Sequence, residues 1–488
     1  MPIYHPLLNF KKNIRLPEYG YIGITELEEK LIDTKYFQRL RRIRQSPGVY
    51  MVFPGSSHSR FEHSLGSMYI AGEAAIHIIL NSKNHIKSTS IIDIINSIDS
   101  KTEIIKQVQA TRLAALLHDI GHAPFSHTFE EFLKFVNPYS DWKHETLGLE
   151  ILYTKLKCIF EQQSSQFNID VCEVMALLCD LEMDDNNNFT IRDRTKRNLQ
   201  GFGMTSDEID KMQQFLDANW YLNHLVKEDP YNVDRFNYLI LDSNRTGAKE
   251  YGTIDVERII QNLYFIEKDR IITVSTKAKD AVLRFFEAYT QMYRSIYLHK
   301  ASQGADLHLS YTMAEAAKLD GNIFSKISKP DIETILNLSD DVLIYELTLL
   351  PKEEDNVKRL VEDYLNRNIL SFVYEFNLDD NNKLTDIMIA NGSCGLANEI
   401  KKKANLTKEK TILIANMTEK KAAKMPITGM ALKKLNFYNI EKKCMEQVDL
   451  TTTNQSTISS KIYRIYCERE DKETIKKKIS LMINQSKD

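Results

Sequence analysis

Apolar residues recur at helical spacing along most of the chain before residue 300. Segments 21–50, 58–82, 102–119, 144–162, 208–226, 231–246 and 277–299 each carry apolar side chains three or four positions apart. This spacing gathers the apolar side chains on one face of a helix. The pattern therefore predicts a mostly α body built from amphipathic helices.

The last third of the chain has a different pattern. Short runs rich in β-branched and aromatic residues, at 410–415 and 461–466, predict strands, as does a similar run at 270–274. A chain of 488 residues can form two or three domains, or one large helical domain with an appended lobe. We predict a helical core over residues 1–330 and a smaller α+β lobe over 331–488.

Composition narrows the class of protein. The N-terminus lacks a basic segment followed by an apolar one, and no stretch approaches the ~18 apolar residues of a membrane span. The six cysteines form no CxxC pair, which favours a reducing compartment and packing roles. These features predict a soluble cytoplasmic protein without a membrane partner.

Charge is unevenly distributed although the net charge is only −3. Residues 401–488 hold 20 of the 64 Lys and Arg but only 10 of the 67 Asp and Glu. A basic tail can contact nucleic acid. Most of these lysines alternate with acidic and apolar residues, so a solvated face is the favoured interpretation.

Four potential metal ligands lie on three separate segments of helical character. They are His63, His118, Asp119 and Asp234. Two imidazoles and two carboxylates without a thiolate suit one divalent ion, namely Fe, Mn, Ni, Co, Zn or Mg, that keeps positions open for water and substrate. A lone buried His or Asp is more often a satisfied core residue, but the four in this order favour a metal site.

The adjacent pair needs a special local structure. Neighbouring residues in a helix point about 100° apart. His118 and Asp119 therefore converge on one ion most easily at a helix end, which Gly121 and Pro124 predict.

The ligand order and the sequences around it resemble the HD-domain deoxynucleoside triphosphate (dNTP) triphosphohydrolases. The resemblance runs from about residue 14 to 375 and is carried by Ile32 to Thr34, Phe37 to Arg41, Val52 to Gly66, His118 to Glu130, Trp142 to Glu145, Asn232 to Tyr238 and Tyr297 to Lys300. It implies an HD-domain helical core. It also implies metal-dependent hydrolysis of dNTPs to deoxynucleoside and inorganic triphosphate, with Mg on the substrate phosphates, in a homodimer or homotetramer.

The same resemblance assigns three catalytic residues beside the metal: His122, Glu130 and His144. His122 is the implied acid for the leaving 5′-oxygen, with Glu130 and His144 orienting it. An imidazole that titrates near neutral pH suits proton transfer. The alternative for His144 is an exposed histidine at a helix start.

Substrate contacts are implied as well. The resemblance gives Arg60, His127 and Arg235 phosphate or base-side contacts, places Tyr297 against the 2′ carbon, and offers Gln45, Tyr238 and Asp242 to the 3′-hydroxyl. The chain departs from the family at Tyr289, where an arginine for the γ-phosphate is expected; Arg284 or Arg294 could substitute. Tyr289, Tyr293 and Tyr297 at four-residue spacing could instead be plain packing.

A nucleotide effector, either a guanine nucleotide or a dNTP, is a further implication. Asp33, Gln38 and Arg41 match the positions that read guanine at a subunit interface, and Lys277 and Lys300 are candidate phosphate contacts. Arg15-Leu16, Ser275 and Ala281 depart from that pattern. A surface salt bridge between Asp33 and a nearby arginine explains the acid equally well.

Two other functions remain open. One is an HD phosphohydrolase acting on another nucleotide or phosphoester. The other is a nucleic-acid-binding protein with a structural HD core, which the metal set disfavours. Residues 380–488 match no motif of the family.

Overall fold

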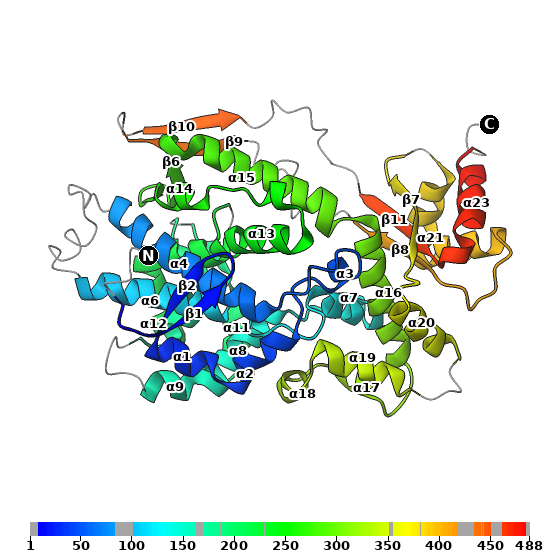
Figure 1. The fold of residues 1–488 in the computed structure, drawn as a ribbon, viewed down its shortest axis with the longest axis horizontal. Coiled ribbons are helices and arrows are strands. Elements are labelled where there is room, and N and C mark those ends of the chain that lie inside the picture. Colours follow the sequence, from blue (N-terminus) through cyan, green and yellow to red (C-terminus); the bar gives the residue numbers. More distant parts are fainter. Residues whose placement is uncertain are drawn as a thin grey trace.

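A computed structural model describes residues 8–82, 101–162, 169–185, 187–228, 230–350, 355–380, 382–417, 434–440, 442, 444–449 and 461–484. Helices dominate and the sheets are small, so the predicted mostly α architecture with a smaller α+β lobe is confirmed. Figure 1 shows the helical body and, beside it, the lobe that holds the last helix.

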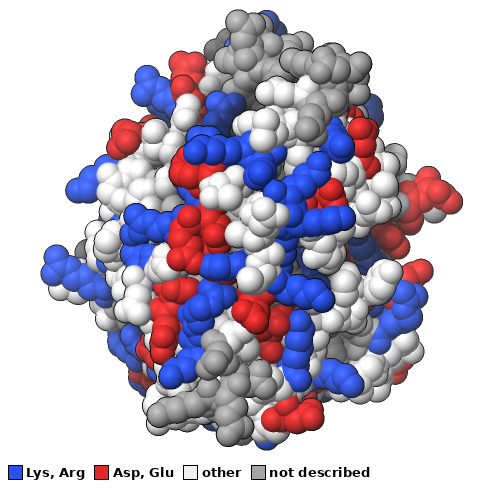
Figure 2. Space-filling view, turned by 90° about the vertical axis from the view of Figure 1, so that its right-hand side faces the viewer, with Lys and Arg blue, Asp and Glu red and all other residues white. Residues whose placement is uncertain are grey.

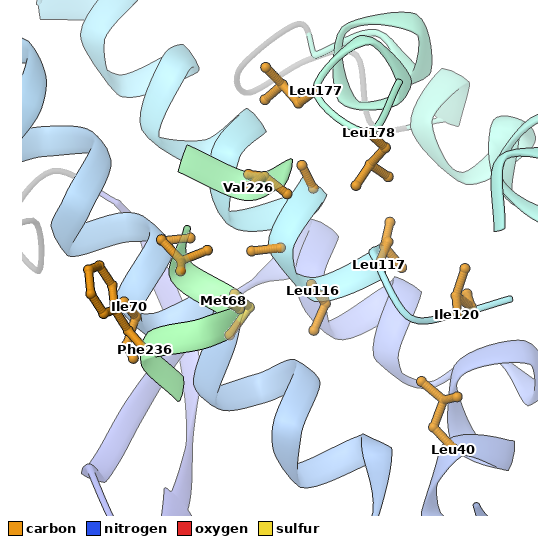
Figure 3. Packing of buried hydrophobic residues seen from close by; sticks show 14 of the residues in the cluster. Leu40, Met68, Ile70, Leu116, Leu117, Ile120, Leu177, Leu178, Val226 and Phe236 are labelled. Carbon is orange, nitrogen blue, oxygen red and sulfur yellow. The ribbon is translucent and has the colours of Figure 1, made fainter. Parts of the chain in front are cut away.

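Long helices form the centre of the body. α4 (Arg60–Ser82) packs along α6 (Lys101–Leu117) and α13 (Val233–Thr246), and α12 (Ser206–Lys227) contacts all three. Figure 3 shows Met68, Leu116 and Phe236 meeting where these helices face one another, and all three are fully buried. This shared core fixes the ends of α4, α6 and α13 relative to one another.

The segment before α4 differs from the predicted helix over 21–50. β1 (Phe10–Leu16) and β2 (Gly20–Thr25) form an antiparallel hairpin in which Ile14 pairs with Ile22. A capping box between Thr25 and Glu28 then starts α1 (Glu26–Ile32). The helical prediction was wrong for residues 21–25, because cross-strand pairing outweighs helical spacing in so short a stretch.

A buried ion pair ties this hairpin to the core. Arg112 of α6 donates to Glu28 Oε1 (2.6 Å) and Oε2 (2.8 Å) and to the carbonyl of Gly23 (2.9 Å). Gln109 donates to the same carboxylate. The side chains of Arg112 and Glu28 are wholly buried, so each charge depends on the other.

Replacing Arg112 by methionine is expected to destabilise the fold by about 3 kcal/mol or more, because it leaves the Glu28 carboxylate buried without its counter-charge. Denaturant-induced unfolding monitored by circular dichroism measures the loss. The double variant Arg112→Met/Glu28→Gln removes both charges and should recover part of it. Equal stability of the wild type and the single variant would contradict the argument.

Strands from distant parts of the chain share one sheet. Its order is β10 (Cys444–Asp449), β9 (Lys434–Asn439), β6 (Ile271–Ser275) and β5 (Leu263–Ile266). β9 runs parallel to β6, and the other neighbours are antiparallel. The strand predicted at 270–274 is confirmed, and two strands from the last third of the chain extend the sheet of the helical body.

The α+β lobe has a core of its own. β11 (Ile462–Cys467) lies between β7 (Ser371–Asn377) and β8 (Ile412–Asn416), which confirms the strands predicted at 410–415 and 461–466. α21 (Lys383–Lys403) and α23 (Lys472–Asn484) pack on this sheet. A second hydrophobic cluster, running from Val373 to Met482, fills the space between them.

The division at residue 330 stays a prediction. α19 (Asp340–Thr348) and α20 (Asp355–Leu365) follow that position, yet Leu343 and Val361 belong to the hydrophobic cluster of the body. The separate cluster of the lobe begins at Val373.

The remaining elements complete the body. They are α2 (Lys35–Gln38), α3 (Pro47–Tyr50), α7 (His127–Val136), α8 (His144–Ile151), α9 (Lys157–Gln162), α10 (Val171–Ala176), β3 (Leu181–Met183), β4 (Phe189–Ile191), α11 (Asp193–Gly201), α14 (Val256–Ile260), α15 (Lys279–Met292), α16 (Lys300–Ala317), α17 (Ile323–Ile327) and α18 (Ile332–Leu336). Within the described residues, every helix is too short or too polar to span a bilayer.

Candidate active site

The four predicted metal ligands converge. His63 Nε2 lies 2.8 Å from Asp234 Oδ1, 3.3 Å from His118 Nε2 and 3.6 Å from Asp119 Oδ2. His118 Nε2 lies 3.3 Å from Asp119 Oδ1 and 3.5 Å from Asp234 Oδ1. Three helices deliver them: His63 comes from the first turn of α4, the adjacent pair follows α6, and Asp234 lies in the first turn of α13.

The helix end predicted at the adjacent pair is confirmed. α6 ends at Leu117, and a turn carries His118 and Asp119. At Gly121 an added Cβ would lie 2.0 Å from the carbonyl oxygen of His144 and 2.3 Å from the backbone nitrogen of Gly148. Only glycine permits this approach, so Gly121 lets α8 pack on the turn and brings His144 into the site.

The outer nitrogens of both ligand imidazoles are held by neighbouring residues. The Asn237 amide lies 2.8 Å from His63 Nδ1, and Tyr19 donates to the Asn237 oxygen at 2.7 Å. His118 Nδ1 lies 2.7 Å from the carbonyl oxygen of Ala115. Both Nε2 atoms therefore face the site. His118 can donate from Nδ1 to the Ala115 carbonyl, which leaves its Nε2 lone pair for a metal, and the Asn237 amide fixes the orientation of the His63 ring. Sequence analysis missed Asn237, although it lies one turn beyond Asp234 on the same helix.

The charges around the four ligands are consistent with a cation site. Burial raises the pKa of Asp119, but the charges of Arg60, His118 and His122 together outweigh burial and hold that pKa well below its usual range. Burial lowers the pKa of His118, but the carboxylates of Asp119 and Asp234 raise it to about 9. A proton on His118 occupies the place of a cation, so a bound metal must displace it. His63, His118 and Asp119 lie close enough to hold one ion, and the partly exposed Asp234 contacts both imidazoles, so this set of two imidazoles and two carboxylates fits a divalent ion.

The three predicted catalytic residues form a group beside the ligands. The rings of His122 and His144 stack with centroids 3.6 Å apart and an angle of 17° between planes. His144 Nδ1 lies 2.6 Å from Glu130 Oε1, and His122 Nε2 lies 3.3 Å from Asp119 Oδ1. His144 is buried, so its alternative as an exposed helix-start histidine is wrong.

The two stacked imidazoles have opposite pKa shifts. Burial and the charge of Arg60 hold the pKa of His122 well below its ordinary value. Burial lowers the pKa of His144, but the carboxylates of Glu145 and Glu130 raise it above the ordinary value. Stacked rings repel if both are charged. The structure therefore places the proton of the pair on His144 and leaves His122 neutral.

One cavity of about 800 Å³ connects these groups. It is lined by the three predicted catalytic residues, by His118, Asp119 and Asp234, and by the predicted substrate residues Gln45, Arg60, His127, Arg235, Tyr238, Asp242 and Tyr297. His63 lies behind this lining. The residues predicted for substrate binding thus share one space, while their individual roles stay predictions.

The cavity arginines already have partners. Arg60 donates from Nε to Ser126 Oγ at 2.7 Å and from Nη1 to Asp119. The guanidinium of Arg235 lies over the ring of Tyr289, 4.7 Å from its centroid. Tyr289, the departure from the family pattern, therefore lines the cavity next to Arg235. Arg284 and Arg294, the suggested substitutes, are exposed and lie off the lining.

Two of the residues predicted for the deoxyribose, Tyr297 and Asp242, form a hydrogen-bonded chain with His58. Tyr297 donates through its hydroxyl to Asp242 Oδ2, and His58 Nε2 lies 2.6 Å from Asp242 Oδ1. Tyr238 meets Tyr297 edge to face, with centroids 6.0 Å apart. Residues Tyr293–Tyr297 form a π-helical turn, a distortion often found at functional sites. Sequence analysis missed His58, which is fully buried behind Asp242.

The predicted effector residues divide into two sets. Arg41 donates to Gln38 Oε1 at 2.9 Å, and Gln38 donates to the carbonyl of Ile32, next to Asp33. Asp33 pairs weakly with Lys12 at 3.7 Å, so its surface salt bridge is to a lysine rather than an arginine.

The two lysines make their contacts elsewhere. The carbonyl oxygen of Lys277 accepts from Arg258 beside β6, and the ammonium of Lys300 lies 4.0 Å from the ring centroid of Phe372. Within one chain, the two lysines therefore contact residues other than those that contact Asp33, Gln38 and Arg41.

Comparisons with known proteins define the class. Residues 60–197 match the HD domain family. Among its relatives is the bovine "Deoxynucleoside triphosphate triphosphohydrolase SAMHD1", 25% identical over 97% of this chain and 78% of that protein. The human protein of that name is 25% identical over 75% of this chain, which spans 55% of the human length. The predicted resemblance to HD-domain dNTP triphosphohydrolases is confirmed.

Two further comparisons concern proteins without a described activity. "Uncharacterized protein YwfO" of Bacillus subtilis is 27% identical over 76% of this chain and 73% of its own length. A crystal structure of a hypothetical protein from Aquifex aeolicus has a TM-score of 0.61 at 21% identity, covering 96% of this chain and 99% of that chain. The latter shows a shared fold.

Proposed function

We propose that this protein hydrolyses dNTPs to deoxynucleoside and inorganic triphosphate with a divalent metal. The observation that carries the proposal is the convergence of the four candidate metal ligands beside the Glu130–His144–His122 group, next to one cavity. The relatives named as dNTP triphosphohydrolases support the choice of substrate.

His63, His118, Asp119 and Asp234 would hold the metal. A bound divalent ion supplies Lewis-acid chemistry, polarising a phosphoryl oxygen and making water more acidic. Arg60 keeps Asp119 ionised and thus ready to serve as a ligand. Asn237 and the carbonyl of Ala115 keep both imidazoles turned toward the site.

In this proposal, His122, Glu130 and His144 supply the proton of the leaving group. In our proposal His122 delivers a proton to the 5′-oxygen as its bond to phosphorus breaks. His144 holds a proton against Glu130 and stacks on His122, so it fixes the orientation of the His122 ring. The negative charge of a bound triphosphate raises the pKa of a neighbouring imidazole, which allows His122 to become charged.

Phosphate charge requires cations, and the cavity offers Arg60, Lys134, Lys227 and Arg235. The guanidinium of Arg235 lies over the ring of Tyr289, which helps to position it. We propose that Arg235 and His127 contact the phosphates, with Mg bound to the phosphate chain, and that Gln45 and Tyr238 contact the sugar.

Tyr297 sets the sugar specificity in this proposal. Its ring lines the cavity and its hydroxyl is engaged by Asp242, so a ribose 2′-hydroxyl placed against the ring would meet carbon and lack a partner.

Replacing Tyr297 by alanine is expected to lower the preference for dNTPs over NTPs by about 10-fold or more, because the missing ring leaves room for the 2′-hydroxyl. The ratio of kcat/KM values for dGTP and GTP measures this preference. Tyr293→Ala, one turn earlier, serves as a matched control. An unchanged ratio in Tyr297→Ala would remove the tyrosine from sugar selection.

The function is tested by incubating metal-loaded protein with each dNTP and each NTP, alone and in mixtures, and separating the products by chromatography. Deoxynucleoside with intact triphosphate is the expected result. Release of monophosphate or pyrophosphate, or turnover of NTPs equal to that of dNTPs, would overturn it. Such a result would favour an HD phosphohydrolase on another nucleotide or phosphoester, for which Tyr289 in place of the expected arginine is the supporting observation.

Mixtures also test regulation. We propose that a guanine nucleotide or a dNTP binds at an interface between copies of this chain, through Asp33, Gln38 and Arg41 with lysines of another copy. Turnover that needs a second nucleotide, together with a change in oligomeric state by light scattering, is the expected outcome.

Figure 2 shows Lys and Arg interspersed with Asp and Glu on the face that carries the α+β lobe, which supports a solvated surface over a nucleic-acid interface.

A further inference from the structure

The loop between the metal ligands and α7 has an unusual backbone. Phe125 has φ 60° and Ser126 has φ 54°, and neither residue is glycine. Backbone angles in this region cost free energy and persist only where surrounding contacts enforce them. The loop joins the turn that carries Asp119 to the helix that carries Glu130, so its shape determines how these groups face one another.

Asp340 supplies the enforcing contact. Phe125 donates its backbone N–H to Asp340 Oδ1 at 2.7 Å, and Arg44 donates its backbone N–H to Asp340 Oδ2 at 2.9 Å. The residue is 1% exposed and stands in the first turn of α19. One buried carboxylate therefore joins two loops that are about 80 residues apart in sequence.

Ser126 carries this connection into the site. Its hydroxyl donates to the carbonyl oxygen of Arg44 at 2.8 Å and accepts from Arg60 Nε at 2.7 Å. Arg60 in turn donates to Asp119. Gln45, the residue after Arg44, lines the cavity. A path of hydrogen bonds thus runs from Asp340 through both loops to a metal ligand and a substrate residue.

We propose that Asp340 is a positioning residue that locks the Arg44–Gln45 and Phe125–Ser126 loops together and thereby sets the shape of the cavity for substrate. The consequence for substrate rests on the proposed function, whereas the joining of the two loops does not. Asp340 lies in α19, outside residues 60–197, which match the HD domain. The contact that joins the two loops therefore comes from a helix that follows the matched region.

The protonation state of Asp340 affects how it joins the two loops. Burial raises its pKa to about 6, although the N–H groups of Arg44 and Phe125 oppose that rise. The charged and titratable groups facing it are the Arg44 guanidinium at 3.6 Å, Asp341 and Tyr364. A carboxyl group with a raised pKa takes up its proton at a higher pH than usual. Acidification through about pH 6 therefore removes an acceptor from one of the two loops.

The test compares Asp340→Asn with Asp341→Asn. The asparagine at 340 keeps the shape of the side chain but points an NH₂ group at one of the two backbone donors. Asp341 is adjacent, and its side chain is 80% exposed with a 3.8 Å contact to Arg44, so it is a matched control. Amide hydrogen exchange at Arg44 and Phe125 reports the joining of the loops, and steady-state dNTP hydrolysis reports its effect on substrate.

In Asp340→Asn, exchange at both amides is expected to rise at least about 10-fold, with KM raised and kcat/KM lowered about 10-fold or more. Asp341→Asn should match the wild type. Wild-type exchange rates in Asp340→Asn would overturn the proposal. A lower melting temperature with unchanged KM would also overturn it, because a merely structural residue changes the amount of folded enzyme and not its affinity.

The wild type provides a second measurement if the variant does not fold. Its KM is expected to rise as pH falls through about 6, and a KM that is flat across this range would contradict the role. If the wild type cleaves no dNTP, the proposed function fails while the exchange comparison still decides whether Asp340 joins the loops.

Discussion

Replacing His63 by alanine is expected to remove the bound metal and to lower kcat/KM for dNTP hydrolysis by about 10⁴-fold or more, which is at least about 5 kcal/mol of transition-state stabilisation. His63 Nε2 lies within 3.6 Å of the other three ligands, so its loss opens one side of the site. Elemental analysis gives the metal content per chain, and steady-state hydrolysis rates give the change in kcat/KM.

His77→Ala is the matched control. His77 is also a buried histidine of α4, and burial lowers its pKa to about 4. It lies 14 residues beyond His63, about 21 Å along the helix axis. The control should keep its metal and its activity, and any loss of stability in it estimates the cost of removing a buried imidazole from this helix. Full activity of His63→Ala without metal would contradict the metal-dependent mechanism.

The sequence predicted the elements that bring the site together, for a physical reason. The ligands lie in or next to long segments whose apolar spacing extends over several turns, and such segments are the ones that sequence patterns predict most reliably as helices. Gly121 and Pro124 predicted the helix end that frees His118 and Asp119, and α6 does end at Leu117. The sequence pattern of a segment was sufficient to predict its structure where the contacts that determine that structure lie within the same segment.

Residues whose importance comes from distant partners were not predictable in this way. Asn237 is held by Tyr19, 218 positions away, and Asp340 accepts from Phe125, 215 positions away. Asp340 follows Ser339 at the start of a helix, so in sequence it resembles an ordinary first-turn acid. The β1–β2 hairpin was missed because cross-strand pairing, rather than the spacing within one segment, decides its structure.

Replacing His122 by alanine is expected to lower kcat for dNTP hydrolysis by about 10²–10⁴-fold, the usual contribution of a positioned acid or base. Metal content and KM should change little, because His122 contacts the ligand set only at Asp119, 3.3 Å away. The pKa of His122 is held low by burial and Arg60, so the proton reaches it only when substrate charge is present. Steady-state kinetics with metal-loaded protein give kcat and KM separately.

His127→Ala is the control for removing an imidazole from the same wall of the cavity. Its ring lies 5.2 Å from that of His122, and its side chain is 57% exposed. An exposed group that binds phosphate contributes mainly to KM, so this variant should lose affinity more than kcat. The reverse pattern, with kcat lost in His127→Ala and kept in His122→Ala, would reassign the acid.

A change of leaving group separates proton donation from a positioning effect of His122. An aryl phosphate ester that releases p-nitrophenolate needs no proton on its leaving oxygen, whereas the 5′-oxygen of a deoxynucleoside does. If His122 is the acid, His122→Ala should cleave the aryl ester nearly as fast as the wild type while remaining defective on dNTPs. An equal defect on both substrates would mean that the stacked pair of His122 and His144 orients the reacting groups, and the acid would have to be sought among the other groups that line the cavity.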